Sequence, residues 1–231
     1  MDISIETEKV KIKTEDEINI SGILVKPDNA HSAILYLHMM PATKESWEPL
    51  MIFLASHGYA SLAIDLRGHG ESDDGPKGYT NYKPIHHQKS LNDLEAGINY
   101  LTQTFPHISK EDIILFGASI GAQLSLQYLA NHTSNKIGVL LSAGLNYAEI
   151  DAIRLAPRIA GDKHILLIAS HQDFAGGSDN AVQNQAIFAA FGEIFDKQIK
   201  IYENAGHGTN ILNSEPELFE IIFNFLNEAR I

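Results

Sequence analysis

One serine lies in a pattern that suits nucleophilic chemistry. Residues 117–121 read Gly-Ala-Ser-Ile-Gly, a G-x-S-x-G motif that follows a short apolar run and precedes a helical pattern. A sharp turn from strand into helix exposes the hydroxyl of Ser119, and the flanking glycines let neighbouring backbone pass closely. The helix begins with free N–H groups and the positive end of its dipole, which favour an oxyanion. We therefore interpret Ser119 as a candidate nucleophile.

A serine nucleophile needs a base, and the base needs an acid that orients it. His207 lies between two glycines shortly after the last expected strand, so we interpret it as the base. Asp173 follows the expected strand before that one and is our candidate for the acid. Asp179 stays open as an alternative acid, because Gly176-Gly177 between the two aspartates can let either approach the histidine.

The elements that must position these residues alternate between strand and helix patterns. Segments 9–14 and 17–26 alternate apolar and polar residues, which predicts antiparallel strands near an edge. Short apolar runs predict strands buried on both faces of a parallel sheet, at 33–37, 60–64, 113–116, 137–141 and 165–169. A more polar strand is predicted last, at 197–202. Helical patterns cover 46–57, 91–101, 122–130, 148–156, 181–191 and a last helix that Ser214 begins as N-cap. This alternation predicts an α/β fold with a mainly parallel sheet, in which ligands bind at the carboxyl ends of the strands.

Composition excludes several other kinds of site and partner. The 231 residues include 11 histidines but no cysteine, which excludes a thiol nucleophile and any cysteine-ligated metal. A net charge of −12 disfavours nucleic acid and anionic membrane surfaces as partners. The apolar runs are too short for a membrane span, and the charged first residues lack the apolar core of a secretory signal. We expect one domain over residues 1–231, a cytoplasmic location, and no cofactor or metal.

From about residue 17 to its C-terminus the chain resembles the α/β-hydrolase family. The matching segments are GASIG, the strand segment ILLIASHQD, the late AGHGT, the loop DLRGHGES at 65–72, and LHMMP at 37–41 followed by Trp47. The resemblance implies an α/β-hydrolase fold with a central sheet of about eight strands flanked by helices. It also implies the triad of Ser119, His207 and Asp173.

In this family, two backbone N–H groups form the oxyanion hole. Carried over by position, these donors belong to Met40 and Ile120. His38 and Met39 are expected beside the site. Met39 stands where many family members have glycine, which eases backbone approach, so this side of the oxyanion hole departs from the usual pattern.

The segment that holds a large cap in many relatives is short here, because only residues 142–163 lie between the expected strand at 137–141 and the apolar run at 164–169 that contains the next strand. We expect a minimal lid within 143–163, with residues 73–88 as a second possible cover. The resemblance implies a serine hydrolase that cleaves a carboxylic ester, or a thioester or amide, of a small substrate through an acyl-enzyme. Two alternatives remain: a small peptidase, because relatives similar to dienelactone hydrolases and prolyl oligopeptidases also have small caps, and a ligand sensor with little turnover.

Overall fold

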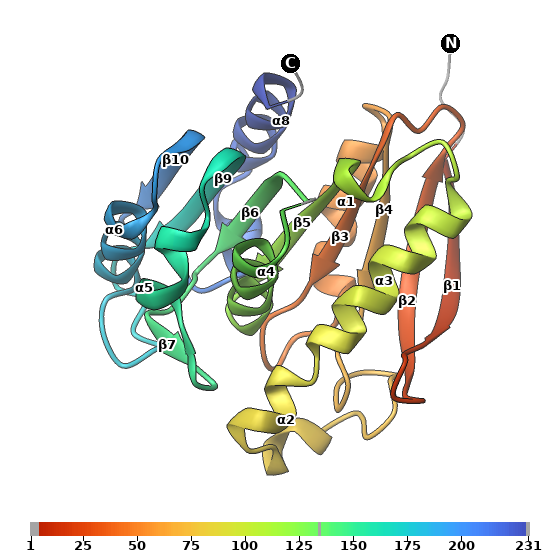
Figure 1. Cartoon of the computed structure of the whole chain (residues 1–231), viewed down its shortest axis with the longest axis horizontal. Coiled ribbons are helices and arrows are strands. Elements are labelled where there is room, and N and C mark those ends of the chain that lie inside the picture. Colours follow the sequence, from red (N-terminus) through yellow and green to blue (C-terminus); the bar gives the residue numbers. More distant parts are fainter. Residues whose placement is uncertain (1–4, 134, 230–231) are drawn as a thin grey trace.

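An eight-stranded sheet runs through the middle of the structure, and helices cover both of its faces (Figure 1). The computed structural model describes residues 5–133 and 135–229. The strands lie in the order β1-β2-β4-β3-β5-β6-β9-β10. Their bounds are β1 Ile5–Lys13, β2 Asn19–Pro27, β3 Ser32–Leu37, β4 Tyr59–Ile64, β5 Ile113–Ala118, β6 Ile137–Leu141, β9 Gly161–Ser170 and β10 Ile194–Tyr202. The pairs β1–β2 and β2–β4 are antiparallel and the remaining pairs are parallel, which confirms the predicted architecture.

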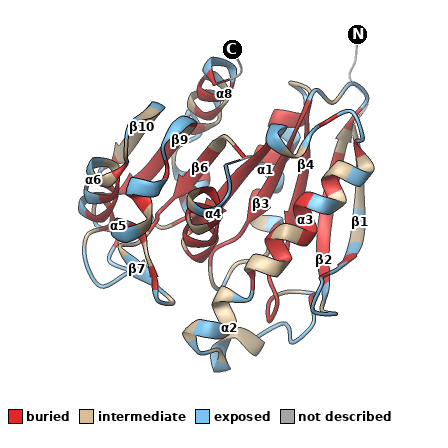
Figure 2. Ribbon diagram, in the orientation of Figure 1, coloured by how far each residue is buried: buried red, intermediate tan, exposed pale blue. Residues whose placement is uncertain are grey.

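Side chains alternate between two apolar layers because successive residues of a strand point to opposite faces of a sheet. In β3, Leu35 and Leu37 belong to one buried cluster, whereas Ile34 and Tyr36 belong to the other. The first layer packs against α3 (Leu91–Thr104), α4 (Ile120–Asn131) and α6 (Asn180–Ala190), and the second packs against α1 (Glu48–Ala55), α7 (Asn210–Ser214) and α8 (Leu218–Glu228). Figure 2 shows the resulting burial of the central strands. Within the two described ranges, no helix has the length and apolar content needed to cross a membrane.

The start of the last helix was wrongly predicted. Ser214 is the final residue of α7, and its hydroxyl donates to the carbonyl of Asn210 instead of capping a new helix. The chain leaves helical geometry at Glu215, with φ of −127° and ψ of 80°, because the residue before a proline disfavours the helical region. Helix α8 therefore begins only at Leu218, beyond Pro216.

The predicted helix over 148–156 is also wrong in its first half. A small hairpin of β7 (Asn146–Tyr147) and β8 (Ile150–Asp151) precedes a single turn of helix, α5 (Ala152–Leu155). The side chain of Asp151 accepts the N–H of Arg154 and so fixes the helix start at residue 152. The hairpin turns through Ala148 and Glu149, which both have positive φ, of 52° and 61°.

The segment at 73–88 meets this hairpin. It contains a short 3₁₀ helix, Gly78–Asn81, and α2, Pro84–Gln88. The side-chain amide of Gln88 donates to the carbonyl of Ala148 at 2.8 Å. In Figure 1, α2 and the β7 hairpin lie at the same end of the sheet. The two segments expected as covers are therefore in contact.

A buried arginine joins the loop after β4 to two other parts of the fold. The guanidinium of Arg67 donates to Asp93 of α3 from Nε at 2.9 Å and from Nη2 at 2.7 Å. It also donates to Asp16, in the turn between β1 and β2, from Nη1 at 2.7 Å and from Nη2 at 2.9 Å. The side chain of Asp93 is fully buried, whereas that of Asp16 is one-third exposed. Such bidentate pairs fix geometry as well as charge.

We predict unequal costs for removing the two carboxylate charges. Asp93→Asn should lower the free energy of unfolding by about 3 kcal/mol, because it removes the carboxylate charge at the fully buried side of Arg67, where water cannot replace it. Asp16→Asn should cost about 1 kcal/mol or less, because Asp16 is one-third exposed and water can reach its side of the pair. Urea denaturation of both variants measures the difference, and equal costs would show that burial does not set the strength of this network.

Candidate active site

The backbone turns sharply at Ser119, between the end of β5 at Ala118 and the start of α4 at Ile120. Ser119 has φ of 52° and ψ of −112°, a conformation that typically costs a non-glycine residue about 1–3 kcal/mol. Its N–H donates to the carbonyl of Leu141 at 2.9 Å, and its carbonyl accepts from the N–H of Gln123 at 3.0 Å. The sheet and the helix thus hold the strained residue from both sides.

The two glycines of the motif leave no room for a side chain. A Cβ at Gly117 would lie 2.3 Å from the carbonyl oxygen of Gly121. A Cβ at Gly121 would lie 2.2 Å from the carbonyl oxygen of Leu37, at the end of β3. The turn at Ser119 therefore packs directly against the strand that leads into the loop of Met40.

His207 and Asp173 lie together, although 33 residues separate them in the chain and they follow different strands. Nδ1 of His207 donates to Oδ2 of Asp173 at 2.7 Å. The aspartate side chain is 2% exposed and the histidine side chain 21% exposed. Because Nδ1 carries the hydrogen in this bond, Nε2 is left as an acceptor on the neutral ring. The other oxygen of the carboxylate accepts the N–H of Ala175 at 3.2 Å.

Asp179, the alternative acid, has other partners. Its Oδ1 accepts the N–H of Val182 at 3.2 Å and so caps α6. Its Oδ2 accepts from Nδ1 of His171 at 3.1 Å. Of the two aspartates that the sequence left open, the structure pairs Asp173 with His207.

Two serines that the sequence analysis did not single out hold the loop of His207. Ser142 directly follows β6 and has φ of 51°, and its Oγ accepts the N–H of Gly208 at 2.8 Å. Oγ of Ser170, the last residue of β9, accepts the N–H of Ala205 at 2.8 Å. Both serines lie at the carboxyl ends of parallel strands, where functional residues gather in α/β folds. This position in the sequence is the signal that could have identified them.

Met39 and Met40 have different surroundings. Met40 lines the same cavity as Ser119, whereas the side chain of Met39 is buried beneath the His207 loop. A Cβ at Gly208 would lie 2.6 Å from the sulfur of Met39, so the glycine makes room for the methionine. The second expected oxyanion donor, Ile120, is the first residue of α4, and its N–H has no acceptor within the helix.

A buried carboxylate fixes the loop that contains Met40. Oδ1 of Asp65 accepts the backbone N–H of Lys44 at 2.9 Å, and Oδ2 accepts from Nζ of Lys44 at 2.7 Å. Oδ2 also accepts the N–H of Glu71 at 2.9 Å. Hydrogen bonds and charge from Lys44 and Lys9 lower the pKa of Glu71 to about 2. The loops after β3 and β4 are thereby tied to one another.

His38 and His69 form a buried pair behind the site. Their ring centroids are 4.8 Å apart, in an edge-to-face arrangement. Nδ1 of His38 donates to the carbonyl of Met39, and Nε2 accepts the N–H of Leu66. Burial lowers the pKa of His38, and burial together with His38 lowers the pKa of His69 to about 4. Both rings are therefore neutral near pH 7 and support the loops as packed, hydrogen-bonded groups.

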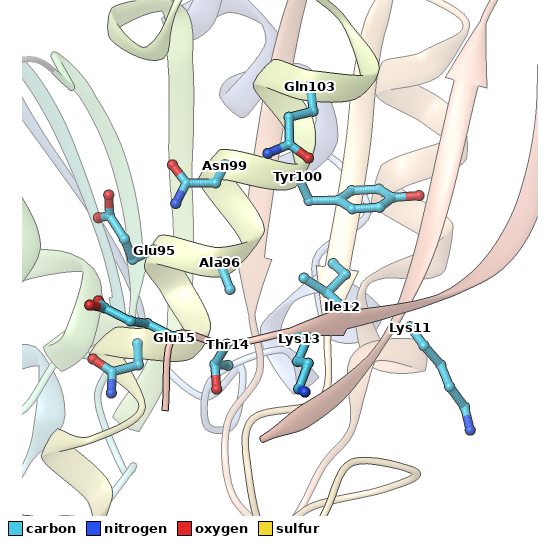
Figure 3. A pocket seen from close by; sticks show the side chains of 11 residues that line it. Lys11, Ile12, Lys13, Thr14, Glu15, Glu95, Ala96, Asn99, Tyr100 and Gln103 are labelled. Carbon is cyan, nitrogen blue, oxygen red and sulfur yellow. The ribbon is translucent and has the colours of Figure 1, made fainter. Parts of the chain in front are cut away.

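A cavity of about 200 Å³ opens between the site and the β7 hairpin. Residues on its wall include Met40, Ser119, Ser142, Tyr147, Ala175 and His207. A larger groove, of about 470 Å³, lies elsewhere, between β1 and α3, where Lys13 and Glu95 contribute opposite charges (Figure 3). The smaller cavity is therefore the one that places a serine hydroxyl and a carboxylate-paired imidazole around the same space.

Comparison with known proteins identifies the family of the chain. A family model described as "Serine aminopeptidase, S33" matches residues 28–172, more than half of the chain. The chain belongs to the α/β-hydrolase family. The resemblance in the sequence motifs is thereby confirmed.

The individual relatives of this α/β hydrolase share only a minority of its residues. The AB hydrolase superfamily protein YisY of Bacillus subtilis (strain 168) is 31% identical over 135 residues, which are 57% of this chain and 44% of that protein. The chain thus matches less than half the length of this curated relative. The esterase Pf2001 of Pyrococcus furiosus superposes with a TM-score of 0.79 at 22% identity, covering 97% of this chain and 93% of that one. An acetyl xylan esterase from Paenibacillus sp. R4 superposes with a TM-score of 0.77 at 17% identity, covering 97% and 84%.

We predict that alanine is tolerated very differently at two glycines of this site. Gly121→Ala should lower the free energy of unfolding by about 3 kcal/mol or prevent folding, because its Cβ meets fixed backbone. Gly144→Ala should be nearly neutral, because its Cβ meets only Oε1 of Gln183 at 3.5 Å. Thermal and urea unfolding compare the two variants, and a stable Gly121→Ala protein would contradict the packing described for the turn.

Proposed function

We propose that this protein is a serine hydrolase that cleaves carboxylic esters through an acyl-enzyme on Ser119. The observation that carries the proposal is the His207–Asp173 hydrogen bond, whose imidazole lines the same small cavity as the strained serine. Membership of the α/β-hydrolase family supports it. An esterase from Pyrococcus furiosus has the same fold over nearly the whole chain, which is consistent with it.

In the proposed reaction, Oγ of Ser119 attacks the ester carbonyl while Nε2 of His207 takes the hydroxyl proton. The tetrahedral intermediate collapses, the C–O bond to the alcohol breaks, and His207 returns the proton to the leaving alkoxide. Water then attacks the acyl-enzyme with His207 again as base, which releases the acid and restores Ser119. Asp173 holds the imidazole in the tautomer that accepts at Nε2 and stabilises its charged form.

The N–H groups of Met40 and Ile120 are the proposed donors to the oxyanion. Each belongs to a segment that the fold holds in place: the loop of Met40 through Asp65 and the start of α4 through the packing of Gly121. Preorganised donors of this kind matter because they need no rearrangement as charge develops, and losing one typically costs about 3 kcal/mol of transition-state stabilisation.

The description of the matching family model favours one second function, an aminopeptidase. The same acyl-enzyme chemistry would then act on an amide, and the leaving group would be an amine. Comparing an alanine p-nitroanilide with p-nitrophenyl acetate separates the two functions. For each substrate, kcat/KM is divided by the rate constant of its spontaneous hydrolysis. We expect this ratio to be higher for the acetate ester than for the anilide.

We predict that Ser119→Ala abolishes both labelling by a fluorophosphonate probe and hydrolysis of p-nitrophenyl acetate, with a loss of about 1,000-fold or more. The matched control is Ser214→Ala, an exposed serine at the end of α7, which should be labelled and active like the wild type. Equal activity in Ser119→Ala and wild type would rule out the proposed nucleophile. Saturable binding with turnover below about 0.01 per second would instead favour a ligand sensor.

We predict that the two aspartates differ sharply in their effect on turnover. Asp173→Asn should lower kcat by about 1,000- to 10,000-fold, because the amide no longer holds His207 in the accepting tautomer. Asp179→Asn should stay close to wild type, because Asp179 caps α6 and bonds to His171. Steady-state kinetics on folded variants measures the difference, and the reverse order of effects would reassign the acid to Asp179.

A further inference from the structure

The cavity beside Ser119 has polar walls without a charged side chain. Four amide side chains contribute to the walls, those of Gln123, Asn146, Asn180 and Gln183. Among the described residues that line the cavity there is no aspartate, glutamate, lysine or arginine. The titratable side chains there are those of His207 and Tyr147, and burial raises the pKa of Tyr147. A substrate group that enters this space therefore meets dipoles but no countercharge.

The buried amides are already engaged with backbone groups. Nε2 of Gln123 donates to the carbonyl of Ile150 at 2.9 Å, and Oε1 accepts the N–H of Gly144 at 3.1 Å. Oε1 of Gln183 accepts the N–H of Leu145 at 2.9 Å, and Nε2 donates to the carbonyl of Ser178 at 3.0 Å. Turning either amide toward a charged substrate would leave buried backbone groups unpaired, which is costly. These two side chains thus fix the wall of the cavity.

The carboxylates near the cavity are committed elsewhere. Asp173 accepts from His207 and from the N–H of Ala175. Asp151 caps α5, and together with Glu149 it faces a separate hollow that Arg154 also lines. An α-ammonium group bound beside Ser119 would therefore lose its hydration without gaining an ion pair.

The size of the cavity adds a second restriction. Its volume of about 200 Å³ is below the range of roughly 300–1,000 Å³ that is usual for drug-sized ligands. Gln123, which forms part of the cavity wall, is fully buried and closely packed. Displacing it to admit a longer acyl chain would therefore cost free energy. The cavity has room for about six to eight heavy atoms of an acyl chain, because a cavity of about 150 Å³ holds a benzene molecule.

We propose that this cavity selects short, uncharged acyl groups and rejects acyl groups that carry a carboxylate or an α-ammonium group. The selection rests on the proposed acyl-enzyme at Ser119. In this proposal the acyl part of the substrate occupies the cavity and the alcohol extends out of it.

Matched pairs of methyl esters test the charge rule, because the poor methoxide leaving group prevents the succinate carboxylate from cleaving its own ester. Hemisuccinate and levulinate differ by a carboxylate in place of a methyl ketone, and the alanine ester and isobutyrate differ by an ammonium in place of a methyl group. Compared directly within each pair, kcat/KM of the charged ester should be about 100-fold lower than that of its neutral partner. Within a neutral series, kcat/KM should fall about tenfold or more from butyrate to octanoate, as a full cavity requires.

Charged variants make the test sharper. Asn146 is exposed at the mouth of the cavity, on β7. Asn146→Asp should raise the alanine-to-isobutyrate ratio of kcat/KM, and Asn146→Lys should raise the hemisuccinate-to-levulinate ratio, each by about tenfold. The control substitutions Asn99→Asp and Asn99→Lys add the same charges on α3, beside the groove of Figure 3, and should leave both ratios unchanged.

The outcomes separate this inference from the proposed function. Hydrolysis that depends on Ser119 but does not distinguish charged from neutral partners would overturn the selection rule and leave the serine hydrolase in place. Octanoate turnover equal to that of butyrate would overturn the size limit in the same way. If no ester in the panel shows hydrolysis that depends on Ser119, both proposals are wrong.

Discussion

At Ser119 the chain passes from strand to helix through a strained conformation that the surrounding contacts must hold, and one of these is the close packing of Gly121 against the end of β3. The same contact joins the serine to the strand that leads into the loop of Met40. The proposed nucleophile and one proposed oxyanion donor therefore share a single rigid support. Rigid support of this kind is what an active site needs, because misplacement of about 1 Å can cost about 100-fold in rate.

The rest of the site is built on the neighbouring strand ends. Ser142 after β6 and Ser170 at the end of β9 each accept a backbone N–H from the loop after β10, so His207 is held by strands other than its own. Behind them, Asp65 and Lys44 join two loops through a buried ion pair. Buried charges weaken a core when they are unpaired, but Asp65 and Lys44 bond to each other and so help to specify one arrangement of the loops.

Much of this arrangement follows from local sequence. Continuous apolar runs indicate the buried strands, and the pattern at 117–121 indicates the turn, because each signal depends on neighbouring residues alone. The choice of Asp173 over Asp179 does not follow from local sequence. The loop between them permits both, and the pairing depends on His207, which is distant in the chain. The amides of Gln123 and Gln183 were missed for the same reason: their backbone partners become neighbours only after the segment between β6 and β9 has folded back.

The position of β10 at the edge of the sheet has a consequence for how the protein loses activity. This strand pairs with β9 alone, and most of its residues are only partly buried. Edge elements open locally at lower free energy than a central strand such as β5, which is paired on both sides. Because the loop after β10 holds His207, the imidazole can leave its partners while the central sheet stays folded. We therefore expect heat inactivation to begin at this edge of the sheet, before cooperative unfolding of the whole domain.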